Sequence, residues 1–199
     1  MQLSFDTSDI NFYFSFQDPY CYLAWVLLQN SLKDFNTIKV KPINIGLNPS
    51  NNKFSYRESW GGSRWLRLAK EAKLLDVTIK KPLAIVSEDL TARCIPIYGV
   101  GGAEYYISSI FKAEFTNNLD ISISPTLRYF LQSEGNDSEI LINASNDSKT
   151  LDAYTAQTDL WGKKRIRAIP TIEVGNERIA GYITKKQLDD LLRSLTDKI

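Results

Sequence analysis

The sequence predicts a mixed α/β fold in which a strand–helix–strand unit at the start and a strand–strand–helix unit at the end enclose a mostly helical segment. Three observations support this prediction. An aromatic-rich run at 11–16 ends in a turn and is followed at once by an apolar helix. Residues 37–45 then largely alternate apolar and polar side chains, as a strand does. Close to the end of the chain, two short apolar runs flank a tight turn and precede a helix with a leucine stripe.

The first unit is best defined at the junction between the strand and the helix. Asp18 is a good N-cap residue, and Pro19 suits the first helical position, where a missing amide hydrogen loses no bond. Apolar residues continue through about Ser31, so we expect a helix over that range. The polar loop 46–52 follows the second strand.

The middle of the chain carries helical patterns. They occur at 60–75, at 103–115, at 126–133 and, interrupted by a polar turn at 143–148, at 139–161. The glycines at 99–102 lack the spacing of a phosphate-binding loop, and we interpret them as the approach to a helix. We therefore expect one domain spanning 1–199, with a helical insertion at about 57–160.

The last unit is a hairpin followed by a helix. Residues 169–174 and 178–181 are typical of two strands joined by the turn 175–177. The closing segment 184–195 places four leucines on one helical face, which predicts a helix packed on the sheet.

Composition limits the partners. The 24 basic and 23 acidic residues leave a net charge of +1, which favours neither nucleic acid nor an anionic membrane surface. Small molecules or proteins are the expected partners, and we expect a small-molecule substrate. No segment reaches the roughly 20 apolar residues of a membrane helix. Residues 1–14 lack a signal-like pattern, and the two cysteines are far apart, so we expect a cytoplasmic protein.

The chemistry is limited by the absence of histidine, which removes the commonest general base and the usual partner of a nucleophilic serine or cysteine. Cys21 and Cys94 form no CxxC motif, and no metal site is predicted. Catalysis would have to use carboxylates, thiols, tyrosines, lysines, backbone groups or a cofactor.

Two motifs resemble a known superfamily. The segment 12–24, FYFSFQDPYCYLA, resembles the first strand and active-site helix of DsbA-like proteins, notably 2-hydroxychromene-2-carboxylate isomerases and kappa-class glutathione transferases. The segment 168–171, AIPT, resembles their cis-proline loop. The resemblance implies a thioredoxin-like fold with a helical insertion and a glutathione-linked isomerase or transferase that acts on a small unsaturated or aromatic carbonyl compound. It also implies glutathione as cofactor and, as is common in these families, a homodimer.

The residue before Pro19 is the reactive one in that superfamily, a cysteine in redox members and usually a serine in glutathione-dependent ones; here it is Asp18. As an N-cap, Asp18 would accept backbone hydrogen bonds, which lower the pKa of a carboxyl group. Facing a substrate, it would act as the acid or base in a proton-shifting isomerisation. The two roles are compatible.

Cys21 corresponds to the second cysteine of the redox motif. It either packs in the core or, because it lies in the first helical turn, has a lowered pKa and reacts. A DsbA-like oxidoreductase or monothiol protein that uses Cys21 is therefore one alternative to the isomerase. A catalytically inactive binding protein is another, favoured by the lack of serine or cysteine at position 18.

The remaining site residues are also implied by the resemblance. Pro19 and Tyr20 would lie beside the ligand, and Ile169 with a cis Pro170 would present backbone groups to an extended peptide such as glutathione. Glutathione-dependent members hold the γ-glutamyl end with a Gly, small polar residue, Asp, Arg sequence before the last helix. This chain has GYITKK at 181–186, in which Thr184 either replaces a ligand contact or caps the helix.

Two further groups of side chains are weighed against ordinary structural roles. Three arginines near the start of the insertion either pair with a substrate carboxylate or lie on a solvated helix face: Arg57, Arg64 and Arg67. Five aromatic residues either line an apolar pocket or belong to the core: Tyr13, Tyr20, Tyr22, Trp60 and Trp65.

Overall fold

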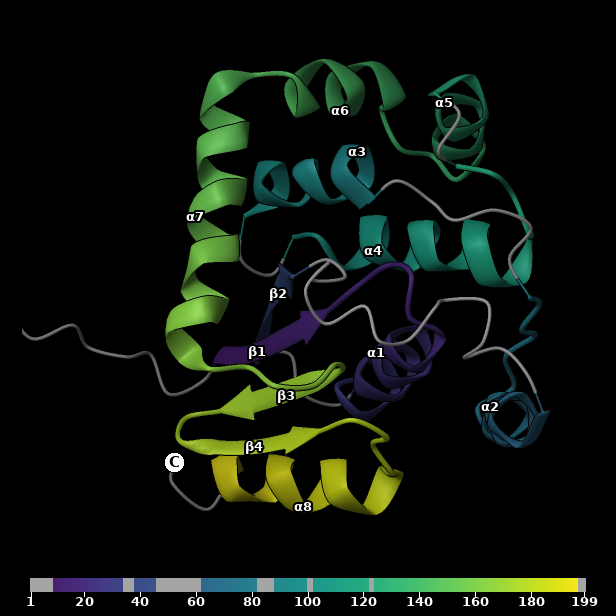
Figure 1. The fold of residues 1–199 in the computed structure, drawn as a ribbon, viewed down its shortest axis with the longest axis vertical. Helices are drawn as coiled ribbons and strands as arrows, with labels where there is room; N and C mark the ends of the chain where they lie inside the picture. Colours follow the sequence, from purple (N-terminus) through teal and green to yellow (C-terminus); the bar gives the residue numbers. More distant parts are fainter. Residues whose placement is uncertain are drawn as a thin grey trace, which may run out of the picture.

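The computed structural model describes residues 9–33, 38–45, 62–81, 88–99, 102–121 and 124–196. Their strands form one four-stranded sheet in the order β2-β1-β3-β4 (Figure 1). The strands are β1 Asp9–Phe14, β2 Lys39–Asn44, β3 Thr171–Val174 and β4 Glu177–Ala180. β1 and β2 are parallel, whereas β3 runs antiparallel to both of its neighbours.

Helix α1, Pro19–Ser31, connects the two parallel strands, and α8, Lys185–Thr196, follows β4. The helices between β2 and β3 are α2 Gly62–Leu74, α3 Glu88–Arg93, the 3-10 helix η3 Ile95–Tyr98, α4 Glu104–Phe111, its π-helical continuation η4 Lys112–Thr116, α5 Ser124–Ser133, α6 Ser138–Ser145 and α7 Ser148–Lys164. The predicted order of a β-α-β unit, a helical insertion and a β-β-α unit is confirmed.

Two short elements of the insertion were not predicted. Helix α3 has six residues and η3 has four, which is too short for a 3.6-residue repeat to become visible in the sequence. The predicted loop 46–52 and the start of the insertion at 57–61 lie outside the described residues.

The two faces of the sheet differ in their cover because side chains alternate along each strand. Ile10, Phe12 and Phe14 enter the main core, where α1 contacts α8 and α8 contacts β3 and β4. Tyr13 and Ile43 point to the other face, where α7 contacts β2. Figure 1 shows α7 running along one edge of the molecule from α6 to the strands, while α8 lies next to β4.

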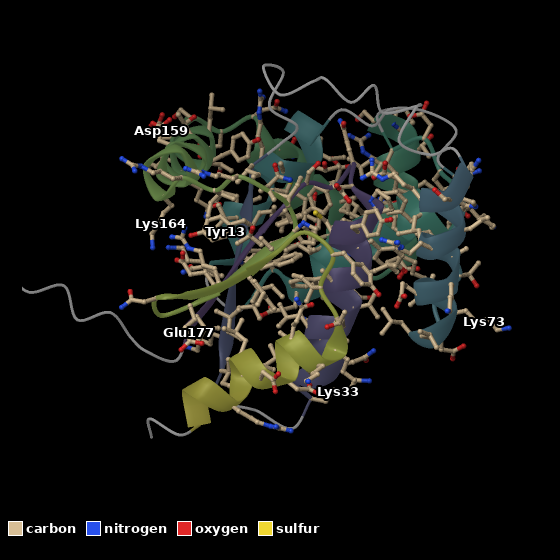
Figure 2. The ribbon with its side chains drawn as sticks, turned by 60° about the horizontal axis from the view of Figure 1, so that its bottom comes forward. Tyr13, Lys33, Lys73, Asp159, Lys164 and Glu177 are labelled. Carbon is tan, nitrogen blue, oxygen red and sulfur yellow. The ribbon has the colours of Figure 1, made fainter. Side chains whose placement is uncertain are left out.

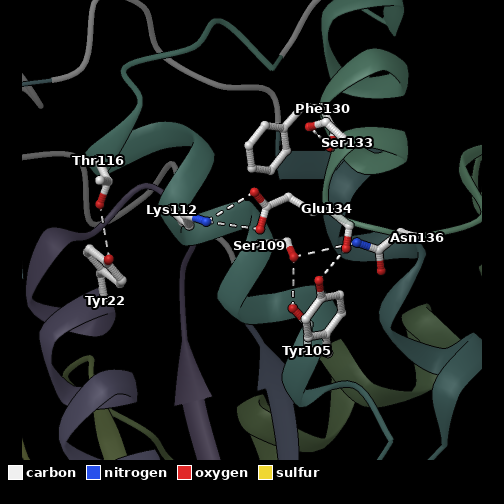
Figure 3. Close-up of polar contacts among 9 residues, drawn as sticks. All are labelled: Tyr22, Tyr105, Ser109, Lys112, Thr116, Phe130, Ser133, Glu134 and Asn136. Atoms are coloured by element: carbon white, nitrogen blue, oxygen red, sulfur yellow. Dashed lines mark hydrogen bonds and ion pairs between the residues drawn. The ribbon is translucent and has the colours of Figure 1, made fainter.

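Aromatic packing ties the insertion to the β-α-β unit. The Phe14 ring lies 5.1 Å from that of Phe12 and 5.7 Å from that of Phe111 in α4, and Tyr22 of α1 stacks on Phe111 at 5.5 Å. The Tyr22 hydroxyl also hydrogen-bonds the Thr116 hydroxyl at 3.1 Å (Figure 3). The start of α1 is therefore held by both the sheet and the insertion.

A polar network occupies the second face of the sheet. The Glu173 side chain, 1% exposed, accepts hydrogen bonds from Asn11 Nδ2 at 3.1 Å, from the Tyr13 hydroxyl at 3.3 Å, from Lys164 Nζ at 2.9 Å and from Arg178 Nε. In Figure 2, Tyr13 and Lys164 lie on the same side of the strands. Burial opposes ionisation of Glu173, but the hydrogen bonds and charges of Lys164 and Arg178 outweigh it and lower the pKa. This carboxylate joins three strands and the end of α7.

In the described part of the chain, no helix is long and apolar enough to span a membrane.

Candidate active site

Asp18 lies in the turn after β1 and caps the first turn of α1. Its backbone is extended, with φ −104° and ψ 115°, and its Oδ1 accepts hydrogen bonds from the amides of Tyr20 at 2.7 Å and Cys21 at 3.3 Å. The amide of Asp18 in turn donates to the Ser15 carbonyl at 3.3 Å. The predicted N-cap is confirmed, and the strand-to-helix turn holds this carboxyl group in one position.

A pocket of about 280 Å³ opens beside Asp18. Its lining comes from the start of α1, the start of α2 and the two ends of the β3–β4 hairpin: Asp18, Tyr20, Ser63, Arg64, Arg67, Ile169, Gly181 and Tyr182. This volume lies just below the roughly 300–1,000 Å³ that is typical of ligand sites, which suits a small molecule or part of a short peptide.

The pKa of Asp18 is raised to about 6, mainly because the carboxyl group is withdrawn from water. Hydrogen bonds from the Tyr20 and Cys21 amides and the charge of Arg64 lower the pKa but do not cancel that effect. The expectation of a lowered pKa at this N-cap is therefore wrong, since two amides and one nearby arginine do not replace the lost solvation. Both protonation states of Asp18 are populated close to neutral pH.

Arg64 and Arg67 lie one turn apart on α2, and both line the pocket. Asp18 is the one acidic residue among the pocket-lining residues that the structure describes, so the pocket has an excess of positive charge. This arrangement favours an anionic ligand. The third arginine proposed from the sequence, Arg57, lies outside the described residues.

Two tyrosines line the pocket beside α2. The rings of Tyr20 and Tyr182 meet edge to face, with centroids 6.3 Å apart and planes at 84°. The Tyr20 hydroxyl donates to the Arg64 carbonyl at 3.4 Å. Burial, together with the nearby Glu71 carboxylate, raises the pKa of Tyr182 to about 12.

Ile169 and Pro170 form the third side of the site. The peptide bond between them is cis, and Ile169 lines the pocket. The Pro170 carbonyl accepts a hydrogen bond from the Gly181 amide at 2.8 Å, so the segment before β3 is fixed against the segment after β4.

A family model for the DSBA-like thioredoxin domain matches residues 9–193. The chain belongs to the DSBA-like thioredoxin family. The thioredoxin-like fold implied by the sequence resemblance is thereby confirmed.

Solved structures support the same fold. A 2-hydroxychromene-2-carboxylate isomerase shares 16% identity with this DSBA-like chain, covers 95% of both chains and superposes with a TM-score of 0.73. The cytosolic disulfide reductase DsbM from Pseudomonas aeruginosa, solved with GSH, shares 14% identity over 96% of this chain and 98% of its own, with a TM-score of 0.65. Reduced DsbA1 from Neisseria meningitidis shares 12% identity over 100% and 90%, with a TM-score of 0.61. No curated protein sequence matches the chain.

Cys21 of this DSBA-like protein is 0% exposed and packs in the main core. Cys94 is also buried, and its Sγ donates to the Leu141 carbonyl at 3.2 Å. Neither thiol is among the pocket-lining residues. The packed role weighed for Cys21 therefore agrees with the structure, whereas a reactive role would require the core to open.

Thr184 caps α8 and is not among the residues that line the pocket. Its hydroxyl donates to Gln187 Oε1 at 2.8 Å and accepts from the Gln187 amide at 3.3 Å, while Gln187 Oε1 also accepts from the Thr184 amide at 2.9 Å. This is a reciprocal capping box. Pro19, also proposed as a binding residue, is half-buried at the start of α1 and does not line the pocket.

The aromatic group considered from the sequence does not form one pocket. Tyr13 belongs to the Glu173 network, Tyr22 stacks on Phe111, and the Trp65 ring lies 5.4 Å from Lys81 Nζ. Trp60 lies outside the described residues, so Tyr20 is the member that lines the pocket within the described ranges.

Sequence reasoning did not identify Tyr182 and Ser63 as pocket residues. The sequence signal that could have pointed to Tyr182 is the glycine directly before it. Gly181 has a φ of 77°, a left-handed conformation that glycine adopts readily. Among the described residues, no group of three or more potential ligands could hold a metal ion.

Proposed function

We propose that this DSBA-like protein is a glutathione-linked isomerase or transferase that acts on a small unsaturated or aromatic carbonyl compound, with Asp18 as the proton-transferring group. The observation that carries the proposal is a fixed carboxyl group in a small pocket with a pKa of about 6. A group that titrates near the working pH can take up a proton in one step and return it in another. An isomerisation needs such a group because it relocates a proton without net oxidation or reduction.

The residues around the pocket suit glutathione. Its net negative charge complements the excess of positive charge from Arg64 and Arg67. Ile169 lines the same pocket, and its backbone would offer an edge to an extended peptide. A disulfide reductase of the same fold has been solved with GSH, which supports the choice of thiol. When bound, glutathione supplies a nucleophilic thiol that can add reversibly to a conjugated double bond.

The chain's own residues have separate roles in this proposal. Asp18 holds or accepts the mobile proton, and its electrostatic partner Arg64 stabilises negative charge that develops on the substrate oxygen. Tyr20 and Tyr182 form an aromatic wall against which a planar substrate packs. Loss of water from Asp18 is what keeps its proton available near neutral pH.

The test is turnover of 2-hydroxychromene-2-carboxylate with reduced glutathione, a probe chosen because the compared isomerase acts on it. Asp18→Asn should lower kcat about 10²- to 10⁴-fold, the usual contribution of a general acid or base, while retaining the helix cap. Asp152→Asn, an exposed site on α7, is the matched control and should behave as wild type. Undiminished turnover by Asp18→Asn would refute the role of Asp18, and absence of both turnover and glutathione binding in wild type would refute the function.

A further inference from the structure

A second pocket of about 150 Å³, the β2–α7 pocket, lies between β2, the 3-10 helix η3 and α7. Helix α7 contacts both β2 and η3, so the three elements enclose the space. Its lining includes Lys41, Pro42, Ile95, Pro96, Ala153 and Gln157. Among the described residues, none that lines this pocket also lines the pocket beside Asp18. An occupant would therefore be independent of the chemistry proposed at Asp18.

Most of the lining of the β2–α7 pocket is apolar. Pro42 and Ile95 are buried, Pro96 is half-buried, and Ala153 lies at the exposed side. At about 30 Å³ per water in the liquid, the pocket has the volume of about five waters, which corresponds to a ligand of about six non-hydrogen atoms. A short aliphatic chain fits this space, whereas a peptide or a nucleotide is too large.

Two polar side chains complete the lining, Lys41 and Gln157, and both are half-buried. Within the described ranges, neither the Lys41 ammonium group nor the Gln157 carboxamide has a hydrogen-bond or ion-pair partner in the protein. Partial burial removes some of their hydration, and a ligand that accepts hydrogen bonds would replace it. Both groups can donate to one carboxylate.

The charge of Lys41 is not neutralised by the carboxylate on the same face of the sheet. Asn11 pairs with Lys41 on one side and with Glu173 on the other, so two strand spacings, about 10 Å, separate Lys41 from Glu173. Glu173 is already bound by Lys164 and Arg178. The three cations and one carboxylate leave an excess of positive charge on this face, which attracts an anion.

The edge strand itself argues against a β-strand as the occupant. β2 is at one end of the sheet order and contains Pro42. Proline is found in sheets mainly on edge strands, where its missing amide hydrogen faces away from the neighbouring strand. An added strand would need that hydrogen, so a small ligand suits the edge better.

We propose that the β2–α7 pocket binds a small monocarboxylate with a short aliphatic chain. The ligand carboxylate accepts hydrogen bonds from Lys41 and Gln157, and its chain packs on Pro42 and Ile95. An unpaired cation, an unpaired carboxamide and an apolar space of this size together select for this class of ligand.

The experiment is an NMR titration of backbone amides with butanoate and with butanamide, its neutral counterpart of the same shape. Butanoate should bind with a dissociation constant of about 1 mM and shift the amides of Lys41, Gly99 and Gln157. Butanamide should bind about tenfold more weakly, because the charged hydrogen bond is lost.

Two variants test the two parts of the pocket. Lys41→Gln should weaken butanoate about tenfold, to the affinity of butanamide. Lys39→Gln, exposed on the same strand, is its matched control and should behave as wild type. Ala153→Leu should fill the pocket and abolish binding of both ligands. Ala156→Leu, exposed on the same helix and outside the lining, is the second control.

Three results would overturn the site. The first is the absence of these amide shifts at butanoate concentrations well above the expected dissociation constant. The second is equal affinity for butanoate and butanamide in wild type. The third is an undiminished preference for butanoate in Lys41→Gln. Shifts confined to the amides around Asp18 would place the carboxylate in the other pocket and would equally refute the proposal.

Discussion

Two carboxyl groups belong to the central part of the sheet, one on β3 and one directly after β1, and their surroundings move their pKa values in opposite directions. Glu173 on β3 is buried but receives Lys164, Arg178 and two neutral donors, so its pKa is lowered. Asp18, after β1, receives two backbone amides and a weaker influence from Arg64, so burial dominates and its pKa is raised to about 6. Burial alone therefore does not decide the charge of a carboxyl group; the number of direct cationic partners does.

The comparison separates a structural carboxylate from a chemical one. Lys164 at the end of α7 and Arg178 on β4 keep Glu173 ionised, so Glu173 does not exchange a proton near neutral pH. Asp18 is fixed as firmly by its cap bonds but is left with an intermediate proton affinity. Asp18, the carboxyl group with the raised pKa, is the one that lines the pocket.

The largest effect on stability should follow removal of the charge on Glu173. Glu173→Gln leaves Lys164 and Arg178 without their anion, and breaking a buried pair typically costs about 3–5 kcal/mol; partial exposure of both cations reduces this to about 2–4 kcal/mol. Urea unfolding measures the change. Glu177→Gln, exposed on β4, is the control and should lie within about 0.5 kcal/mol of wild type. An equally small change for Glu173→Gln would refute the structural role.

Removal of the charge on Asp18 should have the opposite effect and increase stability. Its folded-state pKa of about 6 exceeds the ordinary 3.8, so it contributes stability below about pH 4 that is lost as the pH rises to 6. Asp18→Asn, which retains a cap, should therefore be about 2–3 kcal/mol more stable than wild type at pH 8 and nearly equal to it at pH 4.

Glu173 should show the reverse dependence on pH. Its pKa is lowered, so its contribution is present above the ordinary 4.5 and is lost as the pH falls through the folded-state value. Urea unfolding of Asp18→Asn and Glu173→Gln at a series of pH values compares the two dependences. If Asp18→Asn were destabilised at pH 8, the raised pKa would be contradicted.

Cys21 provides a sharper comparison, because it lies one turn from Asp18 but inside the core. Cys21→Ala should cost about 1–2 kcal/mol of stability through the small cavity it leaves, and it should retain turnover and glutathione affinity. Native wild type should react with a thiol-specific reagent only at the rate of unfolding. Rapid labelling of Cys21, together with lost activity in Cys21→Ala, would favour a monothiol enzyme.

The smallest effect should come from the second helix cap. Thr184→Ala removes the capping box of α8 and should cost about 1 kcal/mol. Glutathione affinity, measured by calorimetry, should be unchanged because Thr184 does not line the pocket. A loss of affinity larger than the loss of stability would return Thr184 to the binding site.

Sequence reasoning succeeded where the determining interactions are local. The cap at Asp18 and the hairpin before α8 depend on neighbouring residues, and both were predicted. The effect of Glu71 on the pKa of Tyr182 links residues more than 100 positions apart, and the Glu173 network joins three strands. The local sequence pattern therefore indicates neither of them. The predicted direction of the Asp18 pKa shift was wrong for the same reason. The cap bonds that lower the pKa are local, whereas the burial that raises it depends on the tertiary structure.

The measurement that tests the central claim most directly is an NMR titration of the side-chain carboxyl carbons of wild type, with Asp18→Asn and Glu173→Gln used to assign the two signals. Asp18 should titrate with a midpoint of about 6, while Glu173 should titrate below its ordinary value in the same sample. An Asp18 midpoint at or below 3.8, the ordinary value, would mean that it is a fully ionised helix cap, and the proposed proton transfer would lose its basis.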